Sequence, residues 1–174
     1  EGWGDTWGIE RRGKGPDDKT DFDIYNADED LGKTAGLQFI KGRDFNLKEF
    51  PTDSTGMILN ESAMKAMGFN QPLGELVKNN GKEWHVVGVI KDFILSSPYY
   101  PTKPMAIAGS KGWFNVIHFK LNPNHNTADN LKRAEAIFKK YNPEYPFEYK
   151  FIDDEYASKF KSEQRTGTLA ALFA

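Results

Sequence analysis

The pair Asn80-Gly81 constrains the fold of this chain more than any other short stretch, because it stands between two runs of strand-forming residues. Asparagine followed by glycine favours a two-residue turn with positive φ angles, and such a turn joins adjacent antiparallel strands. The second run alternates in hydropathy and places on one predicted face Trp84, Val86, Gly88 and Ile90. The sequence therefore predicts a β-hairpin near the middle of the chain.

Short strands and helices are predicted before this hairpin. Residues 20–28 alternate apolar and acidic side chains, as in a half-buried strand. Asp28 or Asp30 can then cap a short helix that Gly36 ends. A further apolar strand leads to Asn60, which is the predicted cap of the next helix.

Residues 126–143 carry the clearest helical pattern. Thr127 is the predicted cap, apolar side chains recur at spacings of three and four, and Asn142-Pro143 ends the pattern. Residues 146–152 follow as a predicted strand, with one face formed by Phe147, Tyr149 and Phe151. Strands and helices are thus mixed and mostly joined as hairpins, which predicts the α+β class.

Composition excludes several classes of function. The 174 residues are 39% hydrophobic and 28% charged, which suits one soluble domain or two small intertwined subdomains. The 23 basic and 25 acidic residues give a net charge of -2 and form no long block of one sign, so nucleic acid is not a predicted partner. The absence of cysteine excludes disulfide bonds and thiolate chemistry.

Asp92 follows Lys91 at the end of the hairpin, where a catalytic carboxylate and a structural corner would both fit. A catalytic carboxylate needs a second acid, base or metal directed at the same reacting atom. His85 and His118 fall within predicted strands, and with His125 they form no pattern that puts two imidazoles on one helix face. We therefore predict no catalytic, cofactor-binding or metal-binding residue and no cofactor, and keep as an alternative a metal-dependent hydrolase that uses His85, His118 and Asp92.

Two further clusters deserve an interpretation. Trp3 and Trp7 lie in the first 18 residues, which are rich in glycine and charge and favour loop or edge structure. Aromatic faces can stack on sugars, so a carbohydrate-binding module is a second alternative. The three consecutive carboxylates of Asp153–Glu155 could hold Ca²⁺ or Mg²⁺, but neighbouring residues at a helix start point in different directions, which favours helix capping.

Five short motifs follow one another along the chain: GRDF, ILNESAMKAMGF, PLGELV, VVGVIKDF and FIDDEYASKFKSEQRTGTL. In this order they resemble the MacB-like periplasmic core domain, which is the extracytoplasmic domain of FtsX-like ABC transporter permeases, in its Bacteroidetes-type variant. The resemblance runs from about Thr20 to the C-terminus. It implies a domain without enzymatic activity, placed between the first two transmembrane helices of a four-helix permease, and makes Asp92 a turn or cap residue.

The resemblance also implies domain boundaries, location and partners. A membrane-proximal, porter-like α/β lobe is expected at residues 1–55 and 112–163, an inserted β-rich lobe at 56–111, and the start of a transmembrane helix at 164–174. The domain would lie in the periplasm as part of an inner membrane protein, and would couple cytoplasmic ATP hydrolysis to efflux of a substrate or to partner activation. Implied partners are an ABC ATP-binding subunit or domain acting through the membrane part, a second permease copy and a periplasmic adaptor protein.

The C-terminal segment, residues 153–174, is compatible with one helix that opens with carboxylates and ends in an apolar run. An apolar run of this length cannot span a bilayer, but it could begin a helix that does. As a stiff rod, such a helix would carry movement of the membrane part into this domain, which is mechanotransmission, with Gly167 as its weak point.

Overall fold

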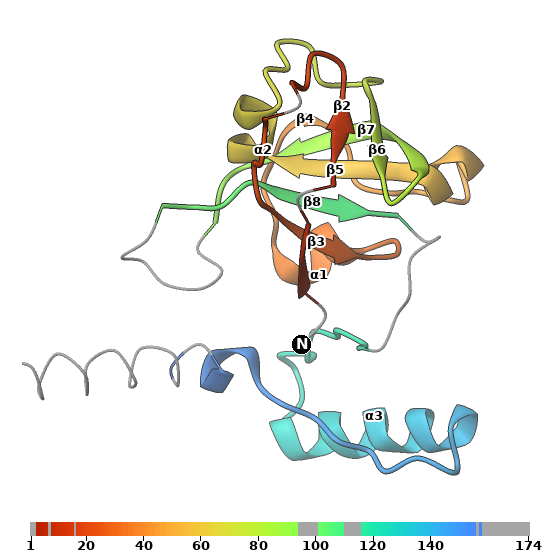
Figure 1. Cartoon of the computed structure of the whole chain (residues 1–174). Coiled ribbons are helices and arrows are strands. Elements are labelled where there is room, and N and C mark those ends of the chain that lie inside the picture. The colour runs from red at the N-terminus through yellow and green to blue at the C-terminus, as the bar shows by residue number, and fades with distance from the viewer. Residues whose placement is uncertain are drawn as a thin grey trace, which may run out of the picture. The chain divides into compact units, whose positions relative to one another are not determined.

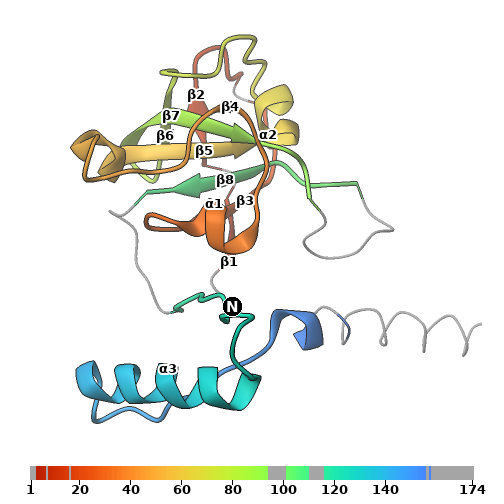
Figure 2. The same ribbon diagram turned by 180° about the vertical axis from the view of Figure 1, so that it is seen from behind.

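The computed structural model describes residues 3–6, 8–15, 17–93, 101–109, 116–155 and 157. The chain divides into two compact units (Figures 1 and 2): unit 1 comprises Glu1–Leu95 and Pro101–Phe119, and unit 2 comprises Ser96–Tyr100 and Lys120–Ala174. The elements in chain order are β1 (Trp3–Thr6), β2 (Glu10–Arg11), β3 (Phe22–Asn26), α1 (Leu31–Ala35), β4 (Phe39–Gly42), the 3-10 helix η1 (Pro51–Thr55), β5 (Gly56–Asn60), α2 (Glu61–Ala66), β6 (Leu76–Asn79), β7 (Lys82–Ile90), β8 (Met105–Ala108) and α3 (Thr127–Tyr141).

The eight strands of the described residues form one sheet in unit 1, in the order β1-β3-β8-β5-β7-β6-β2, with β4 pairing with β7 outside this path. The first and last strands of this order are neighbours in the chain, since β1 ends at Thr6 and β2 begins at Glu10. The sheet therefore curls until its two ends approach each other (Figures 1 and 2), and Thr6 Oγ1 donates a hydrogen bond of 3.3 Å to Asn79 Oδ1 of β6. The predicted edge structure of the first 18 residues is confirmed, because β1 and β2 are the outermost strands.

Two apolar clusters lie on opposite faces of this sheet. The inner cluster includes α2 and consists of Ile9, Phe22, Met57, Leu59, Ala63, Met67, Val77, Trp84, Val86, Ala106 and Ala108. The outer cluster, against which Leu31 of α1 and Phe39 of β4 pack, consists of Tyr25, Ala27, Phe45, Ile58, Val87, Ile90, Met105 and Ile107. Because both faces of its central strands are buried, β5 has no solvent-facing residue. The mixture of strands and helices confirms the predicted α+β class.

The predicted hairpin is confirmed. Asn80 and Gly81 both have positive φ angles, 50° and 73°, and β6 and β7 pair in antiparallel fashion around them. The prediction that Ile90 shares a face with Trp84 is wrong, because a bulge follows Val86 in β7. Met57 of β5 pairs with Val86, whereas the next residue of β5 pairs with Gly88, so Val87 is the extra residue. One extra residue in a strand reverses the faces beyond it, so Ile90 joins the outer cluster.

Unit 2 contains α3, whose position confirms the predicted helix but whose cap differs from the prediction. Asn126 is the cap, since its side-chain oxygen accepts a hydrogen bond of 2.8 Å from the backbone N–H of Asp129. Thr127 is instead the first residue of the helix. Both residue types can cap, and the sequence Asn126-Thr127 does not decide between them.

The predicted strand at residues 146–152 is not a strand in the structure, although its alternation is real. Phe147, Tyr149 and Phe151 form a ladder of rings with centroids 5.7 and 5.6 Å apart, and Phe147 packs 5.6 Å from Phe138 of α3. A strand also needs a hydrogen-bonded neighbour, and no such pairing involves this segment among the described residues. A helical turn begins at Ile152. A bilayer-spanning helix would need a long apolar run, and none of the helices in the described ranges contains one.

The predicted lobes, at residues 1–55 with 112–163 and at 56–111, stay a prediction. Strand pairing joins segments from both of them, since β3 pairs with β8 and β4 pairs with β7. The two compact units divide the chain between Phe119 and Lys120 and on either side of residues 96–100. Which lobe lies near a membrane stays a prediction, and residues 164–174 and Gly167 lie outside the described residues.

Candidate functional site

The N-terminus of α2 holds together segments that are far apart in the sequence. Asn60 ends β5, is 1% exposed, and accepts through Oδ1 a hydrogen bond of 2.8 Å from the backbone N–H of Ala63, which confirms its predicted cap. The same oxygen accepts a hydrogen bond of 2.8 Å from the backbone N–H of Met105. Asn60 Nδ2 donates a hydrogen bond of 2.9 Å to the carbonyl oxygen of Lys103. One buried side chain therefore caps the helix and fastens the start of β8.

Asp92 adds a second cap to the same helix. Its Oδ1 accepts a hydrogen bond of 3.0 Å from the backbone N–H of Ser62, and its Oδ2 accepts one of 2.6 Å from the Ser62 hydroxyl. The backbone N–H of Asp92 donates a third hydrogen bond, 3.1 Å long, to Glu61 Oε2. The first N–H groups of a helix have no partner within the helix, and a carboxylate there also interacts favourably with the helix dipole. The predicted capping role of Asp92 is confirmed, and Lys91 beside it has an exposed side chain.

These residues lie in unit 1, close in sequence to two of the three places where the chain passes from one unit to the other. The chain leaves unit 1 after Leu95 and returns at Pro101, so Asp92 and Lys103 stand just outside this excursion on either side. Lys103 Nζ also forms ion pairs of 2.7 Å with Asp21 and 3.3 Å with Asp23. We call Asn60, Glu61, Ser62, Asp92 and Lys103 the α2 anchor.

The third passage, between Phe119 and Lys120, is preceded by a contact to β3. The Tyr25 hydroxyl and His118 Nε2 share a hydrogen bond of 2.6 Å, with ring centroids 6.2 Å apart. Burial, and then the charge of Asp28, raise the pKa of the Tyr25 hydroxyl above its ordinary value, so the group stays protonated. The prediction that His118 lies in a strand is wrong, because residues 116–120 form no regular structure; the Tyr25 contact holds the imidazole instead.

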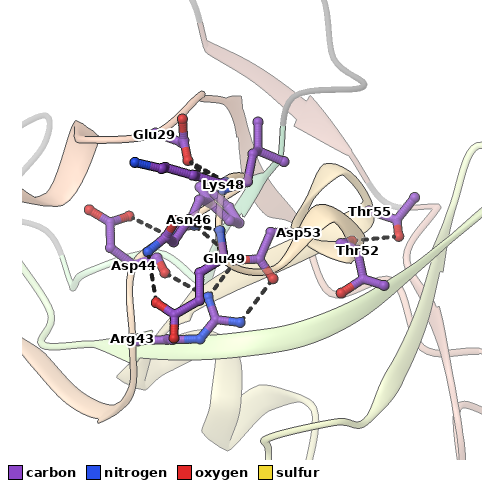
Figure 3. A network of polar contacts seen from close by, with 11 residues as sticks. Glu29, Arg43, Asp44, Asn46, Lys48, Glu49, Thr52, Asp53 and Thr55 are labelled. Atoms are coloured by element: carbon purple, nitrogen blue, oxygen red, sulfur yellow. Dashed lines mark hydrogen bonds and ion pairs between the residues drawn. The ribbon is translucent and has the colours of Figure 1, made fainter.

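An ion pair with a buried carboxylate lies in the segment that begins with the GRDF motif (Figure 3). Asp53 of η1 is fully buried, and Arg43 donates to both of its carboxylate oxygens, one of these bonds being 3.0 Å long. The backbone N–H of Asn46 donates a third hydrogen bond, 2.9 Å long, and the guanidinium lies 3.8 Å from the centre of the Phe50 ring. Burial alone would raise the pKa of Asp53, but the hydrogen bonds from Arg43 and Asn46 outweigh it and lower that pKa below its ordinary value.

Asp44 in the same motif caps α1 from outside the helix. Its Oδ2 accepts a hydrogen bond of 2.9 Å from the backbone N–H of Gly32, and its Oδ1 accepts one of 2.9 Å from the backbone N–H of Phe45. Burial raises the pKa of Asp44 despite these bonds. Asp30 occupies the cap position, one of the two predicted, but in a left-handed conformation with φ 67°, and its side chain makes no capping bond.

An open groove of about 640 Å³ lies along β2, β6 and the loop before β6. Strand register pairs Glu10 with Lys78 and Lys78 with Glu83, so charges of opposite sign alternate across three strands. The half-exposed side chains of Leu73 and Leu76 complete the lining. Enclosed, mostly apolar pockets are typical of small-molecule sites, and this open, charged groove is of a different kind.

The residues suggested for a metal-dependent hydrolase and for a carbohydrate-binding module make the following contacts in the structure. His118 contacts Tyr25, Asp92 contacts Ser62, and no group of three or more potential ligands positioned to hold a metal ion is found within the described residues. Trp3 lies in the edge strand β1, and Trp7 lies outside the described residues. Glu155, in the helical turn after Phe151, forms an ion pair of 2.9 Å with Lys150.

Comparison with known proteins gives the arrangement a context. No family model matches this chain. The chain is 26% identical over 166 residues to the macrolide export ATP-binding/permease protein MacB of Aggregatibacter actinomycetemcomitans, an alignment that covers 89% of this chain and 25% of that protein. The chain thus spans about a quarter of the length of this curated relative.

Solved structures show the same fold. The periplasmic region of MacB from Actinobacillus actinomycetemcomitans matches with a TM-score of 0.58 and 20% identity, over 80% of this chain and 64% of that one. A domain assigned to a permease protein of Porphyromonas gingivalis matches with a TM-score of 0.53 and 14% identity, over 84% of this chain and 75% of that one. The chain is therefore similar in sequence to MacB over most of its length and has the MacB-like periplasmic fold, which confirms the predicted resemblance to the extracytoplasmic domain of FtsX-like ABC permeases.

Proposed function

We propose that this chain is the extracytoplasmic domain of an ABC transporter permease and lies in the periplasm, outside the inner membrane. The observation that carries the proposal is the sequence similarity to MacB over 89% of the chain, together with the shared fold. In this proposal the domain performs no bond chemistry. It couples ATP hydrolysis in the cytoplasm to export of a substrate or to activation of a partner.

The residues described above suit a mechanical role. Movement enters through the C-terminal segment, whose first helical turn begins at Ile152 in unit 2. It reaches unit 1 along the covalent links between the units, and the α2 anchor ties two of these links to the central strands β5 and β8. A well-packed core passes on displacement because it is not easily compressed. The curled sheet would therefore move as one body.

The proposal also defines the partners of the full protein. An ABC ATP-binding subunit or domain would supply the energy through the membrane part. A second permease copy would provide the surface against which the domain opens and closes, and a periplasmic adaptor protein would receive the substrate. The open groove beside β2, with its alternating charges, is the surface of unit 1 best suited to contact such a protein.

A flexible insertion tests the mechanical role. Inserting Gly-Gly-Ser after Ser162 in the full-length permease should leave ATP hydrolysis running while export or partner activation falls, because a flexible linker dissipates displacement that a helix transmits. The same insertion after Gly13, where an added β-carbon would meet no other group within 4 Å, is the matched control and should preserve both activities. Full export with the spacer after Ser162 would show that the domain acts as a passive gate.

A further inference from the structure

The strand β2 stands at one end of the strand order, so only β6 pairs with it among the described residues. The two residues that flank the turn between β6 and β7 exchange hydrogen bonds, which leaves the backbone of the preceding residue, Lys78, facing β2. Lys78 pairs with Glu10. The backbone polar groups of Ile9 and Arg11, on either side of Glu10, therefore point away from β6 and form the outer edge of β2.

Lys14 occupies both carbonyl oxygens of this edge. Its backbone N–H donates a hydrogen bond of 3.1 Å to the carbonyl oxygen of Arg11, and its Nζ donates one of 2.8 Å to the carbonyl oxygen of Ile9. A strand added beside β2 would need these two oxygens as acceptors. A single residue thus holds both acceptor positions and places a positive charge at the strand edge.

The sequence Arg-Arg-Gly-Lys at positions 11–14 brings Lys14 back onto the strand. The hydrogen bond from the Lys14 N–H to Arg11 closes a four-residue turn. Gly13, the third residue of this turn, has φ 83°, and a type II turn requires such a positive value at its third position. The position of Lys14 is therefore specified by the local sequence.

The chain beyond the turn is fastened to β2 as well. The Asp18 carboxylate forms an ion pair with the Arg11 guanidinium, whose Nη2 also donates a hydrogen bond of 2.9 Å to the carbonyl oxygen of Ala66 in α2. Hydrogen bonds from Thr20, and then the charge of Arg11, lower the pKa of Asp18 to about 2, so this carboxylate stays ionised at neutral pH. The segment that carries Lys14 is thus held at both ends.

We propose that Lys14 is an edge lock, which prevents β2 from pairing with β2 of a second copy of this chain. Two copies could otherwise pair this edge in antiparallel fashion about a two-fold axis, because the same backbone groups would face each other. In the proposed transporter, the lock would let two permease copies approach without joining their sheets. It lies apart from the proposed coupling path, so its loss should leave ATP hydrolysis unchanged.

Sedimentation equilibrium of the chain tests the lock. Lys14→Met keeps the aliphatic stem but removes the ammonium group, which frees the carbonyl oxygen of Ile9. The self-association constant should rise about tenfold, as expected when one charge-assisted hydrogen bond no longer competes with strand pairing. Lys19→Met is the matched control, because it removes the same charge from an exposed lysine of the same loop, and it should leave the constant at the wild-type value.

Hydrogen exchange then locates the new contact. The backbone N–H of Arg11 faces the outer edge of β2, so in Lys14→Met its exchange should slow as the protein concentration rises, whereas in the wild type it should not change. An unchanged association constant in Lys14→Met would overturn the lock, and so would an equal rise in Lys19→Met. Association without slower exchange at Arg11 would place the contact elsewhere and would overturn it too. Since these measurements need neither ATP nor a membrane, failure of the lock leaves the proposed function standing, and the reverse also holds.

Discussion

Units 1 and 2 differ in how far their apolar side chains are buried. In β5 of unit 1 every residue is buried, whereas none of the 15 residues of α3 in unit 2 is buried, and Ile137 and Tyr141 are 62% and 72% exposed. An apolar pattern therefore indicates which element forms, but burial depends on what covers it. The free energy of folding of the described chain comes mainly from unit 1, where both sheet faces are covered.

A pair of isoleucine substitutions tests this difference most strongly. Ile107→Ala in β8, where the side chain is 2% exposed, should lower the free energy of unfolding by about 4 kcal/mol, because it leaves a cavity between packed strands. Ile137→Ala in α3 should change it by less than about 0.5 kcal/mol. Urea unfolding followed by circular dichroism measures both values. Equal losses would show that α3 is covered as well as β8 is.

The buried ion pair should give the next largest effect. Arg43→Met leaves the Asp53 carboxylate buried without its counter-charge. We expect the free energy of unfolding to fall by about 3 kcal/mol. This value is at the lower end for buried ion pairs, because the Arg43 side chain is 38% exposed. Arg133→Met in α3 is the matched control, with an expected change below about 0.5 kcal/mol. If both variants unfold at the wild-type urea concentration, the Arg43–Asp53 pair contributes nothing to unit 1.

Asp92 should give the smallest effect of the three. Asp92→Ala removes a helix cap and should cost about 1 kcal/mol, whereas Asp92→Asn keeps an oxygen that can accept from Ser62 and should cost less. Neither change should alter the ATPase rate of the reconstituted permease. Thermal unfolding and ATPase assays together distinguish the outcomes. A large loss of activity in a folded Asp92→Asn variant would restore the catalytic interpretation of this carboxylate.

Local signals in the sequence predicted the elements well. Asn80-Gly81 specifies its own turn. Asn60 caps α2 by accepting a hydrogen bond from the N–H of Ala63, only three residues later in the sequence. The order of five motifs indicated the fold, which the comparison with MacB confirms. Such features depend on neighbouring residues, so a single sequence contains the information needed to find them.

Features that depend on distant contacts could not be predicted. Arg43 and Asp53 are both charged and ten positions apart, and no pattern marks them as a pair until the chain folds. Asp44 replaces Asp30 as the cap of α1 for the same reason, because its position is set by the path of the chain after β4. The bulge in β7 is defined by its pairing with β5, and a contact between separate strands cannot be recognised in the sequence of β7 alone.

The short connection between β1 and β2 has a consequence for how this fold fails. Since these strands cover the two opposite ends of one curled sheet, loss of the first 11 residues would uncover β3 and β6 together. It would also remove Ile9 from the inner cluster. Uncovered strand edges pair readily with other chains, and two edges on one molecule allow association to continue from copy to copy. The N-terminal stretch thus completes both ends of the sheet, and we expect a cut before Phe22 to promote self-association of the domain.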